Sequence, residues 1–371
     1  MIKQKTILFL ILISIGGFAQ HQIKTIESLM SENRTKEALP LIDKALLNKN
    51  HNPKLFLYKG MIIQDQIEIS TESREKQAIL DSAYYFYLKA LEYDKENQLK
   101  SIIAENLEFV AKQYSYTGME QFNEKRYSSA LQIFERAINI YNLDFIQRMD
   151  TMQWYNAAIT ADQLKDTEKA IFYYTLITRY NPTDWNSVIA LAKAYKQNGQ
   201  EEEYFKILKQ TNEKHQEISL FYYEIIGYYL EKNKTDSALV YIDLLERYDS
   251  QNDKLYYLKG SILQEKGEIE KANLQYKKSL NLNANNIDAN FNLAANIYNQ
   301  AVDLLKKNKK SSSDITLINQ YLKQTLVYLK LVKQQEPENK YVLSMLLTCY
   351  RELNMDKERL ELEKQIKSIQ N

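Results

Sequence analysis

Similar residues recur in this chain at a fixed interval of 34, and this recurrence restricts the possible fold more than any other feature of the sequence. Two series keep the interval: Ala170, Tyr204, Ala238 and Ala272, and Trp154, Val188, Tyr222 and Tyr256. The segment from Gly260 to Tyr276 also has the same internal offsets as the segment from Gly118 to Phe134. In both segments a helical pattern reaches a polar break, and a second helical pattern follows. The chain is therefore expected to repeat a helix–turn–helix unit.

The unit resembles the tetratricopeptide repeat, a 34-residue helix–turn–helix with Trp, Leu-Gly and Tyr in its first helix. Its second helix has Ala, an aromatic residue and Ala, and a Pro closes the unit. Three groups of residues match best: Trp154, Ala170, Tyr174 and Pro182; Gly118, Ala130, Phe134 and Ala137; and Tyr256, Gly260, Ala272 and Tyr276. The resemblance implies an all-α fold, an α-solenoid of about nine units that forms a right-handed superhelix.

The spacing also predicts the organisation of the chain. Residues 149–286 keep the 34-residue period and are expected to form a regular array. Residues 20–148 form irregular units of the same kind, and residues 287–371 form units with lengthened helices and a cap. Insertions near residues 64–75 and 299–314 account for the extra length.

Individual residues lead to further expectations. Pro40 falls inside an expected second helix, where proline is unfavourable. Ser313 or Asp314 is expected to cap the helix that follows the second insertion, because both side chains accept hydrogen bonds from backbone N–H groups. Asp81 and Asp236, each followed by Ser-Ala, are expected to lie at the starts of second helices.

The N-terminus has the pattern of a secretory signal peptide. Two lysines precede the apolar run TILFLILISI, and Gly17 and Ala19 fill the small-residue positions before a cleavage site. We expect residues 1–19 to be removed, with retention as an anchor as the alternative. The single cysteine, Cys349, cannot form an internal disulfide. An exported chain without disulfides indicates a bacterial periplasm or cell envelope, and secretion is a further possibility.

Composition argues against several classes of function. Without Lys3 and Lys5 the net charge is near −1, which disfavours a nucleic-acid binder, and no membrane span is expected after cleavage. The three histidines have no carboxylate or thiol cluster at metal-ligand spacing, and no phosphate-binding loop or nucleophile motif occurs. The sequence thus predicts no catalytic residue, no metal, no cofactor and no enzyme.

The resemblance also implies a binding groove, because first helices line the concave face in this family and the residue after the Trp-like position faces it. Carried onto this chain, the groove series is Tyr155, Ile189, Tyr223, Tyr257 and Phe291. Lys193 lies on the same face, one helical turn beyond Ile189. Tyrosine suits such a surface, since it offers contact area and one hydrogen-bonding tip.

Packing is the alternative for these aromatic residues. Most of the 29 tyrosines are expected only to fill space between helices, notably Tyr174, Tyr222, Tyr256 and Tyr276. The side chains of the groove series are expected either to bind a partner, or simply to pack between helices or face the solvent.

These observations together predict an exported, non-enzymatic scaffold that binds a protein or peptide partner of unknown identity along its concave groove. One alternative is a structural subunit of a cell-envelope complex that contacts its neighbours through the convex face or the ends. A second alternative is a glycan-binding protein that stacks sugars on aromatic residues.

Overall fold

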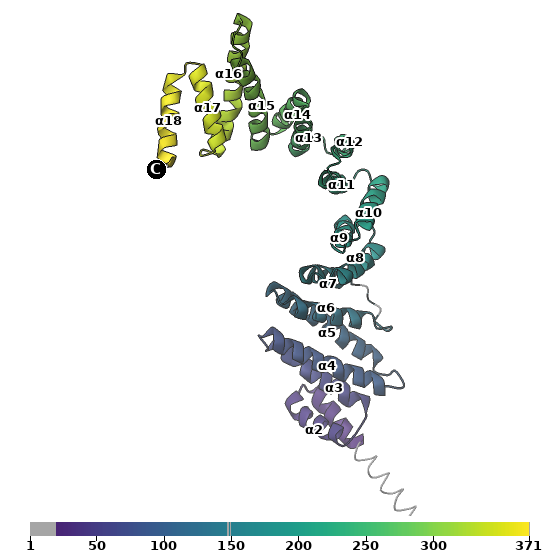
Figure 1. The fold of residues 1–371 in the computed structure, drawn as a ribbon. Coiled ribbons are helices and arrows are strands. Elements are labelled where there is room, and N and C mark those ends of the chain that lie inside the picture. Colours follow the sequence, from purple (N-terminus) through teal and green to yellow (C-terminus); the bar gives the residue numbers. More distant parts are fainter. Residues whose placement is uncertain (1–19, 147, 149, 371) are drawn as a thin grey trace, which may run out of the picture. The chain divides into compact units, whose positions relative to one another are not determined.

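The structure is a computed structural model, and it describes residues 20–146, 148 and 150–370. These residues form helices joined by short turns, without any strand, so the all-α helical-repeat prediction is confirmed (Figure 1). The expected signal peptide, residues 1–19, lies outside the described residues.

The helices follow one another in pairs, and the two helices of a pair contact each other along most of the chain. The pairs are residues 20–31 and α2 (Thr35–Leu47); α3 (Pro53–Gln64) and α4 (Ser73–Tyr93); α5 (Lys100–Asn123) and α6 (Tyr127–Tyr141); α7 (Thr151–Leu164) and α8 (Thr167–Tyr180); α9 (Trp185–Gln197) and α10 (Glu201–Lys214); α11 (Ser219–Glu231) and α12 (Thr235–Leu245); α13 (Asp253–Glu265) and α14 (Ile269–Leu282); α15 (Ile287–Leu305) and α16 (Ser312–Gln335); and α17 (Lys340–Glu352) and α18 (Asp356–Gln370).

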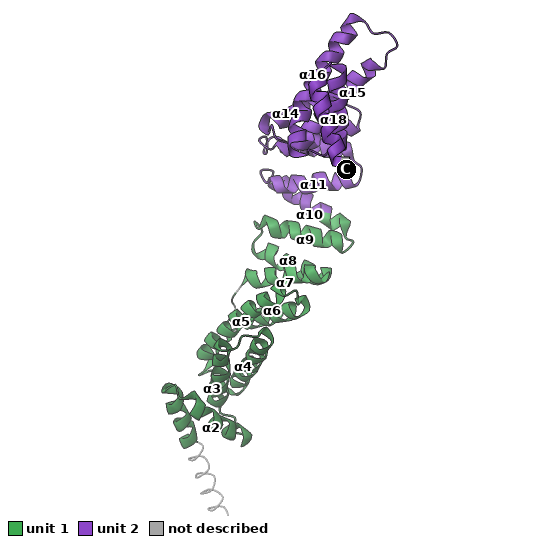
Figure 2. Cartoon of the chain, turned by 90° about the vertical axis from the view of Figure 1, so that its left-hand side faces the viewer, with its two compact units in different colours: residues 1–204 green, residues 205–371 purple. Residues whose placement is uncertain are grey.

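The chain divides into two compact units, residues 1–204 and residues 205–371 (Figure 2). In unit 1 a large apolar core joins α3 to α6, and in unit 2 another joins α15 to α18. The longest helices lie before and after the expected regular array of residues 149–286. α5 and α16 each have 24 residues, whereas α7 and α8 each have 14. The insertion after α3 forms a short 3-10 helix, η1 (Asp65–Glu68).

The second insertion ends in a cap at a different residue from the one expected. Ser311, not Ser313 or Asp314, is the N-cap of α16, and its hydroxyl accepts a hydrogen bond from the Asp314 backbone N–H at 3.1 Å. The Asp314 carboxylate in turn accepts from the Ser311 backbone N–H at 2.9 Å. This reciprocal capping box satisfies two donors of the first turn at once, which one side chain cannot do.

The two Asp-Ser-Ala segments differ in the structure. Asp236 lies in the first turn of α12, as expected. Asp81 lies in the middle of α4, so its expected place at a helix start is wrong. Its carboxylate instead accepts a hydrogen bond from the Tyr114 hydroxyl at 2.5 Å and forms an ion pair with Arg136. Pro40, also unfavourable in the sequence pattern, lies within α2.

Close approach of a glycine to an aromatic ring brings the two helices of a pair together. A Cβ atom added to Gly60, Gly118 or Gly260 would lie 2.6 Å from the ring of Tyr87, Phe134 or Tyr276 respectively. All three rings are fully buried, and burial of each side chain stabilises the fold by about 1.5–3 kcal/mol. The small residue of the repeat pattern therefore faces the large one directly.

The buried tyrosines also need hydrogen-bond acceptors, and the first helices supply them. The Tyr87 hydroxyl donates to Gln64 at 2.9 Å, and the Tyr276 hydroxyl donates to Gln264 at 3.1 Å. In each case the acceptor lies four residues after the glycine that faces the ring. Without such a partner a buried hydroxyl would cost about 1–3 kcal/mol. Part of the tyrosine content thus belongs to helix packing.

In two repeats a further contact between aromatic rings joins the first helix to the C-terminal end of the unit. The ring centroids of Trp154 and Tyr180 are 6.2 Å apart, and those of Tyr222 and Tyr248 are 6.0 Å apart. Trp154 and Tyr222 lie near the starts of α7 and α11, Tyr180 ends α8, and Tyr248 lies in the turn after α12. The four tyrosines that were expected to pack between helices are buried, so that expectation is confirmed for Tyr174, Tyr222, Tyr256 and Tyr276.

We predict that Gly260→Ala destabilises the chain by about 1–3 kcal/mol, because its methyl group would overlap the Tyr276 ring and overpack the helix pair. Gly227→Ala is the matched control in the same unit, since a Cβ atom at Gly227 meets nothing within 4 Å. It should raise stability by up to about 1 kcal/mol through helix propensity. Urea unfolding followed by circular dichroism measures both changes, and equal midpoints for the two variants would contradict the packing role of Gly260.

A pH-dependent prediction concerns Asp162, whose carboxylate accepts a hydrogen bond from the Tyr174 hydroxyl at 2.7 Å. Burial raises the pKa of Asp162 above its ordinary value of 3.8, although this hydrogen bond opposes the rise. A raised folded-state pKa means that stability from this group is present at low pH and is lost as the pH rises through the folded pKa. Asp162→Asn removes this titration. The stability of the variant relative to the wild type should therefore decrease as the pH falls from 7 to 4, and a constant difference in thermal midpoints would refute the assignment.

Candidate functional site

Exposed apolar side chains gather on two first helices of unit 1. On α5, Ile102, Phe109 and Tyr116 are exposed at intervals of seven residues, and Met119 follows one turn later. Seven residues make about two helical turns, so these side chains share one face of α5. Met152, near the start of α7, is also exposed. Exposed apolar side chains that cluster in this way are typical of interaction surfaces.

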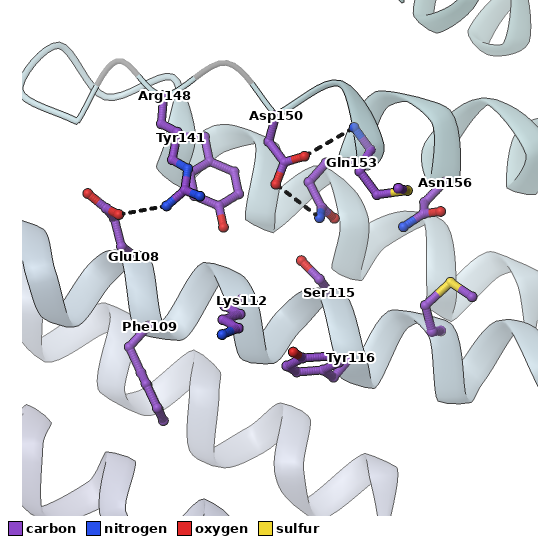
Figure 3. Close-up of a pocket in the computed structure, with 12 residues that line it drawn as sticks. Glu108, Phe109, Lys112, Ser115, Tyr116, Tyr141, Arg148, Asp150, Gln153 and Asn156 are labelled. Carbon is purple, nitrogen blue, oxygen red and sulfur yellow. Dashed lines mark hydrogen bonds and ion pairs between the residues drawn. The ribbon is translucent and has the colours of Figure 1, made fainter. Parts of the chain in front are cut away.

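All of these residues except Ile102 line a pocket of about 510 Å³, which lies between α5, the end of α6 and the start of α7 (Figure 3). Pockets of this size commonly bind a small molecule or part of a partner. The lining residues are Glu108, Phe109, Lys112, Ser115, Tyr116, Met119, Tyr141, Arg148, Asp150, Met152, Gln153 and Asn156.

The α6–α7 connection builds one wall of the pocket. The Asp150 side chain caps α7 by accepting a hydrogen bond from the Met152 backbone N–H at 3.1 Å. The Arg148 backbone N–H donates to the Tyr141 carbonyl at 3.2 Å, and the Arg148 guanidinium donates to Glu108 on α5 at 3.1 Å. These contacts hold the connection against both α5 and α6.

Three nearly buried polar side chains belong to the lining of the pocket. Tyr141, Gln153 and Asn156 are 6%, 4% and 7% exposed. Among the described residues, Oε1 of Gln153 is buried and has no hydrogen-bond partner. The Gln153 Nε2 atom lies 3.5 Å from Asp150. Buried polar groups are normally paired, so Oε1 of Gln153 is an exception within the wall of the pocket.

The pocket carries charges of both signs in equal number. Glu108 and Arg148 form an ion pair, and Asp150 and Lys112 are the other charged residues of the lining. Burial raises the pKa of the Tyr141 hydroxyl, the charges of Asp150 and Glu108 add to the rise, and Arg148 opposes it. The hydroxyl therefore keeps its proton at neutral pH and can donate a hydrogen bond.

The groove residues expected in unit 1 differ in their accessibility. Tyr155 is exposed on α7, between the pocket residues Gln153 and Asn156 in sequence. Ile189 is only 6% exposed on α9, so it has little area to offer to a partner. Lys193, one turn further along α9, is exposed.

The groove residues expected in unit 2 are all partly buried. The Tyr223 hydroxyl donates a hydrogen bond to Asp249 and accepts one from Asn252 at 2.7 Å, so its tip already has partners within the chain. The Tyr257 ring centroid lies 6.0 Å from that of Tyr276. Phe291 packs against the apolar core formed by α15 to α18.

The pocket residues on α5 were missed by the sequence reasoning, although a signal for them exists. Ser115 lies 40 residues before Tyr155, which belongs to the expected groove series, and Met119 lies one helical turn after Ser115. The interval there is 40 and not 34, so a series traced at a constant period stops at α7. Alignment of the Gly118 motif with the later repeats would have extended the groove series to α5.

In the described part of the chain, no group of three or more His, Cys, Asp or Glu side chains could hold a metal ion. No helix among the same residues has the length and apolar character needed to cross a membrane.

Comparison with known proteins supports the repeat assignment. The family model described as tetratricopeptide repeat matches residues 154–184 and 253–286, two of the three groups in which the pattern is clearest. No curated protein matches the sequence.

Three of the solved structures to which the chain is similar are each of low sequence identity. MamA is 16% identical, with 51% of this chain and 99% of that chain covered and a TM-score of 0.38. The C-terminal part of a TPR repeat-containing protein from Cytophaga hutchinsonii is 17% identical, with 68% and 93% covered and a TM-score of 0.47. YrrB, described as a TPR protein with an unusual peptide-binding site, is 15% identical, with 55% and 95% covered and a TM-score of 0.35. Nothing about the partners of this chain follows from likenesses at this level.

Proposed function

We propose that this chain is an exported, non-enzymatic scaffold that binds a protein partner through the first helices α5 and α7. The observation that carries the proposal is the pocket of about 510 Å³ bordered by the exposed side chains of Phe109, Tyr116, Met119 and Met152. Aromatic residues and methionine are enriched at the centres of protein interfaces, because they offer large contact areas. Methionine also adapts its shape to different partners.

Tyr155 extends this proposed surface along α7, and Lys193 on α9 is proposed as a further contact. In unit 2, Tyr223, Tyr257 and Phe291 are proposed as weaker contacts. Their rings are partly buried, and the Tyr223 hydroxyl is already paired with Asp249. Ile189 is left out of the proposed surface because its side chain is buried.

The surface can be tested with Tyr116→Ala and its matched control Tyr85→Ala. The two tyrosines are 55% and 54% exposed in the same unit, but only Tyr116 lines the pocket. Affinity purification from the native cell envelope should recover the same identified partner with the wild type and with Tyr85→Ala. We expect at least about tenfold less of it with Tyr116→Ala, as for truncation of an interface anchor. Full recovery with a correctly folded Tyr116→Ala variant would refute the surface.

Export is proposed from the pattern of residues 1–19, and it predicts a mature chain that begins at Gln20. Intact-mass measurement of the protein from its native cells checks this directly. A mass that includes residues 1–19 would favour the retained anchor, and a full-length protein confined to the cytoplasm would exclude export.

A second candidate function is a structural subunit of a cell-envelope complex, and one observation favours it. Apolar residues are exposed on successive second helices of unit 2, each two residues after the small residue that packs inward: Val240 on α12, Leu274 on α14 and Val327 on α16. Cross-links from the partner to these helices, with none to α5 or α7, would favour this candidate over the pocket-bearing surface.

A further inference from the structure

The methionines of this chain fall into two groups that differ in exposure. Among those that the structure describes, only Met119 and Met152 are exposed, by 38% and 60%. The others are partly buried and pack against the apolar cores: Met30, Met61, Met345 and Met355. Both exposed methionines line the same pocket, and none of the partly buried ones does. The most accessible thioether groups of the described chain are thus gathered at the proposed binding surface.

Backbone contacts fix the position of both exposed methionines. Met119 follows Gly118, where α5 lies so close to α6 that an added Cβ atom would be 2.6 Å from the Phe134 ring. The Met152 backbone N–H donates a hydrogen bond to the capping side chain of Asp150 at 3.1 Å. Each methionine side chain therefore extends from an anchored helix, and a chemical change at its sulfur atom alters the surface of the folded protein.

The single cysteine does not compete with these methionines for an oxidant. Cys349 is fully buried, and burial raises the pKa of its thiol to about 12. The thiolate is the form that reacts with oxidants, so this thiol is inert at neutral pH. Exposed thioether groups are therefore the sulfur atoms that an oxidant reaches first.

We propose that Met119 and Met152 form a site of reversible oxidation, at which hydrogen peroxide converts both thioethers to sulfoxides and so switches partner binding off. The inference rests on the proposed function and adds its regulation. Each sulfur atom attacks one oxygen of the peroxide, the O–O bond breaks, and the second oxygen leaves as water. The sulfur is oxidised by two electrons and the peroxide is reduced. Two thiols, acting through a methionine sulfoxide reductase, restore the thioether and yield a disulfide and water.

The sulfoxide changes what the surface offers to a partner. Its oxygen is a hydrogen-bond acceptor, and burial of an unpaired acceptor against an apolar group is unfavourable. The flexible thioethers beside Phe109 and Tyr116 would become polar, and an adaptable apolar contact would be lost. In the free chain both side chains are exposed, so their sulfoxides stay hydrated there. Oxidation should therefore weaken binding and leave the fold unchanged.

The first measurement compares the reactivity of individual methionines in the full chain. The purified protein is treated with hydrogen peroxide, catalase removes the excess, and peptide mass spectrometry follows the oxygen gained at each methionine. We expect Met119 and Met152 to react at least about fivefold faster than Met61 and Met345, which the apolar cores shield. Fragment spectra separate Met152 from Met149, which lies in the same tryptic peptide. Equal rates at all four sites would overturn the inference.

The second measurement is recovery of the identified partner from the native cell envelope. Peroxide-treated wild type should recover at least about tenfold less of it than untreated protein, and a methionine sulfoxide reductase with dithiothreitol should restore recovery. The double variant Met119→Leu/Met152→Leu keeps apolar side chains of similar volume, so it should bind the partner with or without peroxide. Met61→Leu is the matched control in unit 1, because it removes a shielded methionine and should remain sensitive to peroxide.

Circular dichroism verifies that oxidation acts on the surface and not on the fold. Treated and untreated wild type should have the same helical signal and the same thermal midpoint. Three results would overturn the inference: full recovery of the partner by the oxidised wild type, peroxide sensitivity of the double variant, or loss of helix on oxidation, since unfolding would then explain the lost binding.

Failure of the proposed function would appear without any peroxide. In that case the untreated wild type would recover no partner, or Tyr116→Ala would still recover it. A partner that is lost with Tyr116→Ala but retained by the oxidised wild type would leave the binding surface intact and exclude only its control by oxidation.

Discussion

Contact between a small residue on a first helix and an aromatic ring on the second helix organises the repeats of this chain. At Gly60, Gly118 and Gly260 there is no space for even a methyl group, because the facing ring occupies it. Close approach of this kind buries the ring completely and fixes the separation of the two helices. The buried tyrosines among these rings then require acceptors, and Gln64 and Gln264 supply them from a constant position. Packing and hydrogen bonding thus constrain the same positions in the repeats of Gly60 and Gly260.

The pocket occurs where the chain departs from this regularity. The interval between the units of α5–α6 and α7–α8 is longer than 34 residues, and the extra residues form the connection that carries Arg148 and Asp150. Their contacts with Glu108 and the start of α7 fill one side of the space between two first helices. A regular repeat has no residues to place there. The irregular part of the chain therefore holds this pocket.

Much of the fold could be predicted because packing within a repeat is local in sequence. Gly260, Ala272 and Tyr276 are close enough along the chain for their contacts to follow from helical geometry alone. The cap of α16 at Ser311 and the interior position of Asp81 could not be predicted in this way. The first depends on which of several adjacent polar residues begins the helix. The second depends on Tyr114 and Arg136, which lie on other helices.

The sequence by itself determined the helical pairs, their repeat length and the burial of the tyrosines at the packing positions, since each follows from periodicity and residue size. Only the tertiary structure decided which aromatic residues stay accessible. Tyr155 and Tyr223 occupy the same repeat position, yet one is exposed and the other has its hydroxyl bound to Asp249. Likewise, Tyr141, Gln153 and Asn156 meet at one pocket although nothing in their local sequence marks them. Accessibility and pairing depend on neighbours from other helices, and a repeat pattern does not specify those neighbours.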